Sequence, residues 1–354
     1  MRPVCPRCLR NSGIEAPIEI NSVLREERGA VIEGVLVCSN PQCMCEFPVI
    51  DGIPIIVPDV RSYLSQNLLS ILTRYDLDPD IETILGDCAG PGSDFDAQRQ
   101  HLSTYGFDHY GDLDADEAAS SGESPCSVLR LLEEGLSVVP HPVDGPVIDI
   151  GCAVGRTSFE LAGILDRMVL GVDLNFHMLR VGTRVLQEGI VRYPKRSVGL
   201  VYDRREFPAS FTGAPKVDFW ACDALALPFP PESFSLAASL NVLDCLTSPY
   251  DHLVAIHRLL VPGGNAIVSS PYDWSSSSTP LERWLGGHSQ RSARRGLSES
   301  MLRSLLTEGG HPQAIDGLRI LSEFEAVPWS LRLHARGTVK YQVHMVAVRK
   351  DLEV

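Results

Sequence analysis

The 354-residue sequence has no apolar run of about 18 residues, the length that a membrane-spanning helix requires, so no membrane span is expected. Its first ten residues, MRPVCPRCLR, lack the apolar core of a signal peptide. Without an export signal, the ten cysteines are expected to be thiols or metal ligands rather than disulfides, which favours a cytoplasmic location. The length favours one large domain with a small one beside it.

An excess of positive charge is also absent, because the net charge is −14. The acidity is concentrated in residues 61–140, which carry 4 basic and 15 acidic residues, whereas residues 141–354 carry 22 of each. This balance argues against a nucleic-acid partner without removing the option. Five arginines cluster between Arg283 and Arg303, where a solvated surface is favoured over a phosphate-binding patch.

The first sixty residues contain two pairs of cysteines, Cys5 with Cys8 and Cys38 with Cys43, spaced as C-x2-C and C-x4-C with 29 residues between them. Zinc takes four tetrahedral ligands, and two turns that each present two thiolates supply them. A domain this small has little core of its own, so a structural metal would stabilise it. We therefore predict a closed, structural zinc site on these four cysteines, with Cys45 as the alternative to Cys43.

The tail that follows the second cysteine pair, FPVIDGIPIIVPD at residues 47–59, makes the pattern more specific. Together with the cysteines it resembles the small zinc-ribbon proteins that activate tRNA and protein methyltransferases. In that family the second pair usually has two residues between its cysteines, whereas this sequence has four. The resemblance implies a zinc-ribbon domain at residues 1–60 that stabilises the domain following it.

Residues 61–124 are predicted to connect this ribbon to a larger domain. Apolar residues recur at helical spacing over 61–87, whereas residues 88–124 are rich in Gly, Ser and Asp, a composition typical of a linker or mobile loop. The aromatic cluster YGFDHY at 105–110 interrupts this stretch and is interpreted either as a lid over a pocket or as a docking segment. A helix is expected at 125–136.

The stretch PVIDIGCAVGRTSF predicts a buried parallel strand, a glycine-rich turn and a helix. The dinucleotide fingerprint G-x-G-x-x-G does not fit it. The turn instead resembles the first motif of class I S-adenosylmethionine (SAM) methyltransferases, D-x-G-x-G-x-G, with Ala153 in place of the middle glycine. The resemblance implies that Asp149 orients the cofactor and that Gly151 and Gly155 let the backbone approach its methionine part. Cys152 is interpreted as a small side chain of the same cofactor-binding loop.

Three later positions agree with this resemblance. A second strand ends at Asp173 and Leu174, where an acidic side chain can accept hydrogen bonds from both ribose hydroxyls. Asp223 and Ala224 follow the third strand, at the position that holds the adenine in the family. Asn241 ends the fourth strand and completes the set of predicted cofactor contacts.

The stretch IHRLLVPGGNAIVSS at 256–270 is similar to the family's next helix, Pro-Gly-Gly turn and fifth strand. The order of these motifs predicts an α/β fold, a Rossmann-like seven-stranded class I methyltransferase domain over residues 125–354, with SAM as its cofactor. The strand ends should converge at the switch point where such folds bind ligands.

Two segments bear on the methyl acceptor, NVLD at 241–244 after the fourth strand and SPYDW at 270–274 after the fifth. With GCAVGRTSFELA and the downstream WLGG, they resemble the methyltransferases of ovothiol-type biosynthesis, which methylate a ring nitrogen of thiolated histidine. The resemblance implies a small-molecule substrate. Asp244 and Tyr272 would then hold the ring and take up its proton.

Four more residues are predicted to contact the substrate. Arg156 or Arg283 could pair with a substrate carboxylate, and Trp274 and Trp284 could wall a ring. Each has an ordinary structural alternative: a solvent-facing arginine, loop packing for Trp274 and core packing for Trp284.

Two other functions stay open on the sequence. The zinc ribbon suggests a tRNA or protein methyltransferase with a built-in activator. A non-catalytic scaffold that binds SAM is the third alternative, which the intact Asp149, Gly151, Gly155 and Asp173 disfavour.

Overall fold

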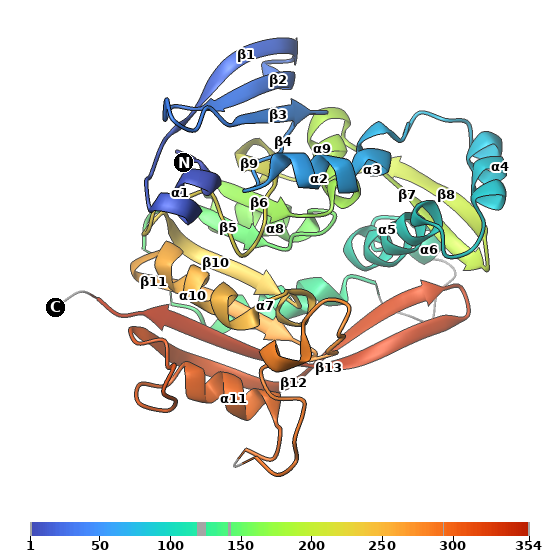
Figure 1. The fold of residues 1–354 in the computed structure, drawn as a ribbon. Helices are drawn as coiled ribbons and strands as arrows, with labels where there is room; N and C mark the ends of the chain where they lie inside the picture. Colours follow the sequence, from blue (N-terminus) through green and yellow to red (C-terminus); the bar gives the residue numbers. More distant parts are fainter. Residues whose placement is uncertain (1, 119–124, 141–142, 293, 353–354) are drawn as a thin grey trace.

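The computed structural model describes residues 2–118, 125–140, 143–292 and 294–352. Its largest sheet has seven strands and lies at the centre of the fold (Figure 1). The strands are β5 Val147–Ile150, β6 Val169–Asp173, β9 Val217–Ala221, β10 Phe234–Leu240, β11 Leu260–Ser270, β12 Leu318–His334 and β13 Gly337–Lys350. Their order is β12-β13-β11-β10-β5-β6-β9. The strands from β11 to β9 run parallel, whereas β13 is antiparallel to both β11 and β12.

Both faces of the sheet are buried. In β5, Val147 belongs to one apolar core and its neighbour Ile148 to the other, as expected of a strand covered on both sides. Helices α7, α8 and α9 contribute to the first core, and α10 and α11 to the second. Their bounds are α7 Ser127–Val138, α8 Arg156–Leu165, α9 Phe176–Glu188, α10 Pro249–Leu259 and α11 Ser298–Leu305. The predicted α/β, Rossmann-like fold is confirmed. Within the described ranges, no helix combines the length and apolar character needed to cross a bilayer.

Residues 2–57 form a smaller structure, here called the N-terminal unit. It consists of α1 Pro6–Ser12 and an antiparallel sheet of β1 Ile18–Glu27, β2 Ala30–Cys38, β3 Glu46–Ile50 and β4 Ile53–Pro54. The unit joins the edge of the large sheet, because Ile55 pairs in parallel with Ala221 of β9 and the Ile56 N–H donates to the Ala221 carbonyl at 2.9 Å. Backbone groups at this end of β9 are therefore paired by the N-terminal unit.

Residues 61–87, where helical spacing was predicted, contain helices, and so does most of the described part of 88–124, which was predicted as a linker or mobile loop. Helix α5, Asp94–Tyr110, is 17 residues long and begins after Ser93, whose hydroxyl accepts the Asp96 N–H at 3.2 Å. The prediction of a loop over 88–124 was wrong for this part, and residues 119–124 lie outside the described residues. The other helices of the region are α2 Val60–Gln66, α3 Leu68–Leu72, α4 Pro79–Ala89 and α6 Ala115–Ala118.

Acidic residues of this helical region pair with basic residues far along the chain. Asp114 accepts from Arg205 at 2.5 Å, and buried Glu117 pairs with Lys195 at 2.6 Å and with Arg332 at 2.8 Å. These bases lie on strand β12 and on a hairpin formed by β7 Ile190–Val198 and β8 Val201–Pro208. Acidic residues of the 61–140 segment therefore form ion pairs with basic residues of the later part of the chain, and composition alone could not reveal these pairs.

Candidate active site

The turn after β5 lies at the carboxyl ends of the parallel strands, where open α/β sheets bind ligands. Gly151 and Gly155 have positive φ angles of 75° and 92°. A Cβ on Gly151 would lie 2.4 Å from Val242 Cγ2, and one on Gly155 would lie 2.5 Å from Phe219 Cζ. The two glycines therefore let the turn pack closely on its neighbours. Ala153, at φ 50°, adopts the left-handed conformation that glycine reaches without steric cost.

Asp149 supports this turn from within the protein. It is 2% exposed, and its Oδ2 accepts the Thr157 and Ser158 hydroxyls of α8 at 2.6 and 2.7 Å. Burial raises the pKa of Asp149 to about 6, although both hydroxyl donors lower it. The carboxylate holds the start of α8 against the strand. Its predicted role in orienting a cofactor would therefore be indirect, through the turn.

Asp173 closes the same turn from the end of β6. Its Oδ2 accepts the Ala153 N–H at 2.9 Å, and its Oδ1 accepts the Asn175 N–H at 2.8 Å. Because an ionised carboxylate has about four acceptor positions, Asp173 retains capacity for two hydroxyl donors. Leu174 is 49% exposed, and its carbonyl accepts the Tyr63 hydroxyl at 2.9 Å. Strand β6 thus ends in an acceptor beside an open apolar side chain.

Asn241 directly follows β10 and has a φ of 58°. Its Oδ1 accepts the Ser269 hydroxyl at 3.0 Å, while its buried Nδ2 has no partner among the described residues. Asp223 and Ala224 follow β9, where the Asp223 carboxylate accepts a backbone N–H two residues ahead at 2.9 Å. The Ala224 carbonyl lies 3.3 Å from Nδ1 of the buried His252. Asn241 therefore offers a donor at the strand ends.

Asp244 ties together the loops that follow β10 and β11. Its buried carboxylate accepts the Ser270 hydroxyl at 3.0 Å through Oδ1 and the Asp273 N–H at 2.8 Å through Oδ2. Burial raises the pKa of Asp244. Because both oxygens hold the SPYDW loop, this arrangement suits a positioning role better than the predicted direct uptake of a proton.

Tyr272 begins a chain of polar side chains that reaches into the sheet. Its hydroxyl lies 2.7 Å from His344 Nδ1, and His344 Nε2 lies 2.8 Å from Glu323 Oε1. When Nε2 donates to Glu323, Nδ1 is the acceptor for the Tyr272 O–H. Arg303 donates to Glu323 and lowers the pKa of that carboxyl. The chain can therefore accept a proton at the tyrosine end and share its charge with the His–Glu pair.

The two tryptophans predicted to wall a substrate ring are packed side by side. The ring of Trp274 stacks on Trp284 at 5.8 Å and on Tyr272 at 6.0 Å between centroids. Trp274 Nε1 donates to the Ser298 hydroxyl at 3.0 Å, and Trp284 Nε1 donates to a backbone carbonyl at 2.8 Å. These contacts fix both indoles and make them a continuous aromatic wall with Tyr272.

The two arginines predicted to bind a substrate carboxylate form ion pairs with carboxylates of the protein itself. The Arg156 side chain is 8% exposed and donates to Asp112 at 3.0 Å and to Glu160 at 2.7 Å. Arg283 is exposed, and its nearest carboxylate is Asp251 at 3.4 Å. The prediction for Arg156 needs correction, because its charge is already neutralised where the acidic helical region meets α8. Arg283 forms a weak surface pair.

Helix α5 brings aromatic side chains to these loops. The buried Tyr110 hydroxyl donates to the Val154 carbonyl, within the turn after β5, at 2.8 Å. Burial raises the pKa of Tyr105, with smaller contributions from neighbours that include Asp173 and Asp244. Tyr105 lies on the same helix, five residues before Tyr110. Of the two interpretations of the YGFDHY cluster, this position favours a cover over the site.

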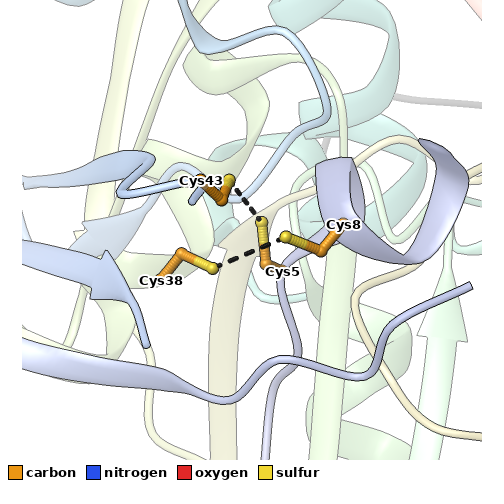
Figure 2. Close-up of side chains that lie close together, drawn as sticks. All are labelled: Cys5, Cys8, Cys38 and Cys43. Carbon is orange, nitrogen blue, oxygen red and sulfur yellow. Dashed lines mark hydrogen bonds between the residues drawn. The ribbon is translucent and has the colours of Figure 1, made fainter. Parts of the chain in front are cut away.

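A separate cluster of four cysteines lies in the N-terminal unit (Figure 2). The sulfur atoms of Cys5, Cys8, Cys38 and Cys43 all lie within 4.8 Å of one another, with 3.9 Å between Cys5 and Cys43 and 3.7 Å between Cys8 and Cys38. Tetrahedral zinc with Zn–S bonds of about 2.3 Å needs sulfurs roughly 3.8 Å apart. The geometry therefore fits a metal ion, and it includes Cys43 rather than the alternative Cys45.

The sequence did not predict His344 and Glu323, which lie outside the motifs and continue the hydrogen-bonded chain that begins at Tyr272. Neither residue belongs to a recognisable pattern. His344 reaches the loop after β11 only because the antiparallel pairing of β11 with β13 sets Ser270 opposite it. The register of two strands that are distant in sequence was the missing information.

Comparison with known proteins gives the class of the larger domain. Residues 148–268 match the family described as "Methyltransferase domain". This match agrees with the strand order and the turn after β5. The chain therefore contains a class I, SAM-dependent methyltransferase domain.

The curated relatives of the chain are distant. It is 27% identical to probable tocopherol O-methyltransferase, chloroplastic, of Oryza sativa subsp. japonica, over 45% of this chain and 40% of that one. It is 23% identical to ajmaline N-methyltransferase of Rauvolfia serpentina, over 49% and 51%. The O-methyltransferase cnsE of Penicillium expansum is 28% identical, over 40% and 43%. The chain spans about half the length of these relatives, whose names include both O- and N-methyltransferases.

Proposed function

We propose that this protein is a SAM-dependent methyltransferase that acts on a small molecule. The observation that carries the proposal is Asp173, a carboxylate with free acceptor capacity at the end of β6, in a domain that matches the methyltransferase family. SAM supplies a methyl group that its sulfonium has already activated. The protein's task is then to align an acceptor and exclude water, which can be worth an effective molarity of roughly 10⁵ to 10⁸ M.

The residues at the strand ends fit such a cofactor. Asp173 would accept both ribose hydroxyls, and the exposed Leu174 would cover one face of the adenine. Asp223 would face the adenine amino group. The unpaired Nδ2 of Asn241 would donate to the cofactor, which satisfies a buried amide that otherwise costs free energy. Gly151 to Gly155 would form the floor of the site.

We infer that the acceptor is a small thiol-histidine-type molecule methylated on an imidazole nitrogen. The neutral imidazole that prevails near pH 7 has the required lone pair on one nitrogen. The Tyr272 oxygen, whose own proton is donated to His344, can accept the ring N–H on the other nitrogen. Asp244 positions the loop, and Trp274 with Trp284 would wall the ring. Neither Arg156 nor Arg283 is placed to bind the carboxylate of such a substrate, so another donor must do so.

A mass-spectrometric screen of the full chain tests this function. The protein is incubated with SAM and thiolhistidine, free histidine or bulk tRNA, and S-adenosylhomocysteine and methylated products are measured. Turnover of thiolhistidine is expected. Asp173→Ala should weaken SAM binding at least about tenfold by removing two charge-assisted hydrogen bonds. Turnover of tRNA alone, or of none of these compounds, would contradict the acceptor.

Tyr272→Phe separates proton handling from binding. It keeps the ring that stacks on Trp274 and removes the hydroxyl, so kcat should fall by about 10²-fold or more while SAM affinity is unchanged. His344→Gln should lower kcat less, because the tyrosine hydroxyl stays in place. An unchanged kcat in Tyr272→Phe would exclude the proposed role of the phenol.

We also propose that the cysteine cluster holds one structural zinc ion and that the N-terminal unit is a zinc ribbon. The four sulfurs have the ligand type and spacing that zinc prefers. Metal analysis of the purified chain should give one zinc per molecule. Cys43→Ser should lose it, whereas the matched control Cys45→Ser should keep it. Equal retention in both variants would exclude Cys43 as the fourth ligand.

A further inference from the structure

A cavity of about 790 Å³ lies apart from the strand-end loops, between helices α3, α4 and α5 on one side and α9 with the β7–β8 hairpin on the other. This volume is typical of small-molecule sites. Among the described residues, its lining shares none with the proposed SAM or acceptor contacts. Much of the wall is apolar, namely Leu69, Leu77, Leu85, Leu102, Val181, Tyr75 and Phe95.

Six arginines also line the cavity, and five of them have a carboxylate partner. The pairs are Arg74 with Asp76, Arg180 with Asp51, Arg184 with Glu188, Arg192 with Glu206 and Arg204 with Glu82. Arg99 is the sixth. In the described part of the chain it has no ion pair or hydrogen bond. The cavity wall therefore contains one cation whose charge is not neutralised by contact.

Arg99 is held in place by rings rather than by anions. It is only 8% exposed, and its guanidinium lies 3.9 Å from the centroid of the Tyr202 ring and 5.5 Å from that of Phe95. Its Nη1 lies against α4, where a Cβ on Gly86 would come within 1.9 Å of it. Ring stacking stabilises a guanidinium but supplies no acceptor for its N–H groups. Glu82, Asp96 and Asp87 act on the Arg99 charge only at longer range, so its N–H groups remain open to an added anion.

Other polar atoms in the same wall lack partners. Of the eight buried side-chain atoms without a hydrogen bond in the described residues, five belong to residues that line this cavity. They are Gln98 Oε1, His177 Nε2, Thr183 Oγ1, the Tyr193 hydroxyl and Arg204 Nε. These atoms are themselves buried, so they form a polar layer behind the cavity wall rather than groups that face a ligand. Arg99 is therefore the group through which the wall could bind an anion.

We propose that this cavity is a second small-molecule site that binds an amphipathic monoanion, with a carboxylate on Arg99 and an apolar body along the leucine-lined wall. One unpaired arginine matches one negative charge, whereas a nucleotide or a diphosphate would need several free cations. The apolar lining matches a hydrocarbon or aromatic body of moderate size. The site does not depend on the methyl acceptor, because its lining is separate from the strand-end loops.

Calorimetric titration of the full chain with decanoate, decanol and decyltrimethylammonium, below their micellar concentrations and without SAM, tests the proposal. Decanoate should bind at least about tenfold more tightly than the other two, because only it can form a charge-assisted hydrogen bond with Arg99. Equal binding of decanol, or no binding of decanoate, would overturn the proposal.

Two variants locate the site. Arg99→Gln should weaken decanoate at least about tenfold, whereas Arg291→Gln, an exposed arginine outside the cavity, should not change it. Leu102→Trp keeps the arginine but fills the cavity, so it should also weaken decanoate. Thermal melting checks that each variant is folded. If Arg99→Gln does not fold, the Leu102→Trp titration decides, and full affinity there would place decanoate elsewhere.

Discussion

The turn after β5 and helix α5 touch each other through Val154 and Tyr110, yet the chain specifies them in opposite ways. The turn is specified locally, because its glycines and the buried Asp149 lie within a few residues of one another. The helix is specified by distant partners: Asp108 accepts hydrogen bonds from Ser127 and from Trp329, which is 221 residues away. A chemical motif can therefore be identified from a short stretch, whereas the cover of the site cannot.

The largest expected effect comes from breaking the turn. Gly151→Val would force a β-branched residue to a φ of 75° and place its Cβ 2.4 Å from Val242 Cγ2. The strain and the clash together should displace the turn and abolish SAM binding. Calorimetry with SAM measures this, with thermal melting as a check on folding. Near-normal affinity would show that the turn is less constrained than its geometry indicates.

The second test measures how much the contacts of α5 with distant residues contribute to the stability of the fold. Asp108→Ala would leave buried donors of Ser127 and Trp329 without an acceptor, so the free energy of unfolding should fall by about 4 kcal/mol. Denaturant unfolding measures the change. Asp94→Ala, at the exposed start of the same helix, is the matched control and should cost less than about 1 kcal/mol. An equal loss of unfolding free energy in Asp108→Ala and Asp94→Ala would show that the distant contacts of Asp108 do not stabilise α5.

A third test uses the proton on Asp149. Its pKa in the folded state, about 6, exceeds the ordinary value of 3.8, because burial disfavours the charged form. Its contribution to stability is therefore complete below about pH 4 and is lost as the pH rises through 6. Relative to Asp149→Asn, which does not titrate, the wild type should lose about 2 kcal/mol between pH 4 and pH 7. Urea unfolding of both proteins at pH 4 and pH 7 measures it, and a constant difference would exclude the titration.

The smallest effect is expected at Ala153. Its φ of 50° suits glycine at least as well as alanine, so Ala153→Gly should leave SAM affinity within about twofold of the wild type. Stability should change by less than about 1 kcal/mol, because relief of strain offsets the greater freedom of the unfolded chain. Calorimetry and melting check both. A large loss of affinity would show that the Ala153 side chain itself contacts the cofactor.

The parts predicted from sequence were those with local chemistry. The parallel strands carry continuous apolar residues, which predicted the α/β fold. Asp173 ends its strand beside the turn that Asp149 supports, so the cofactor-binding turn could be predicted from short segments of the sequence. Arg156 was misjudged because its partner Asp112 belongs to a segment whose composition indicated a linker. His344 was missed because only strand register brings it to Tyr272. Each error concerned a pairing across long sequence separation, which local periodicity does not encode.

The backbone pairing of Ile55 with Ala221 bears on how this chain would aggregate when the N-terminal unit is destabilised. β9 is the last strand of the large sheet, and the N-terminal unit pairs with its open side at Ala221. Loss of the cysteine cluster would loosen that unit and free β9 to pair with the same strand of another molecule. If the cysteine cluster holds the proposed zinc ion, removal of that ion should therefore lead to aggregation of the chain. The four cysteines would then protect the chain from aggregation and take no part in the reaction of the substrate.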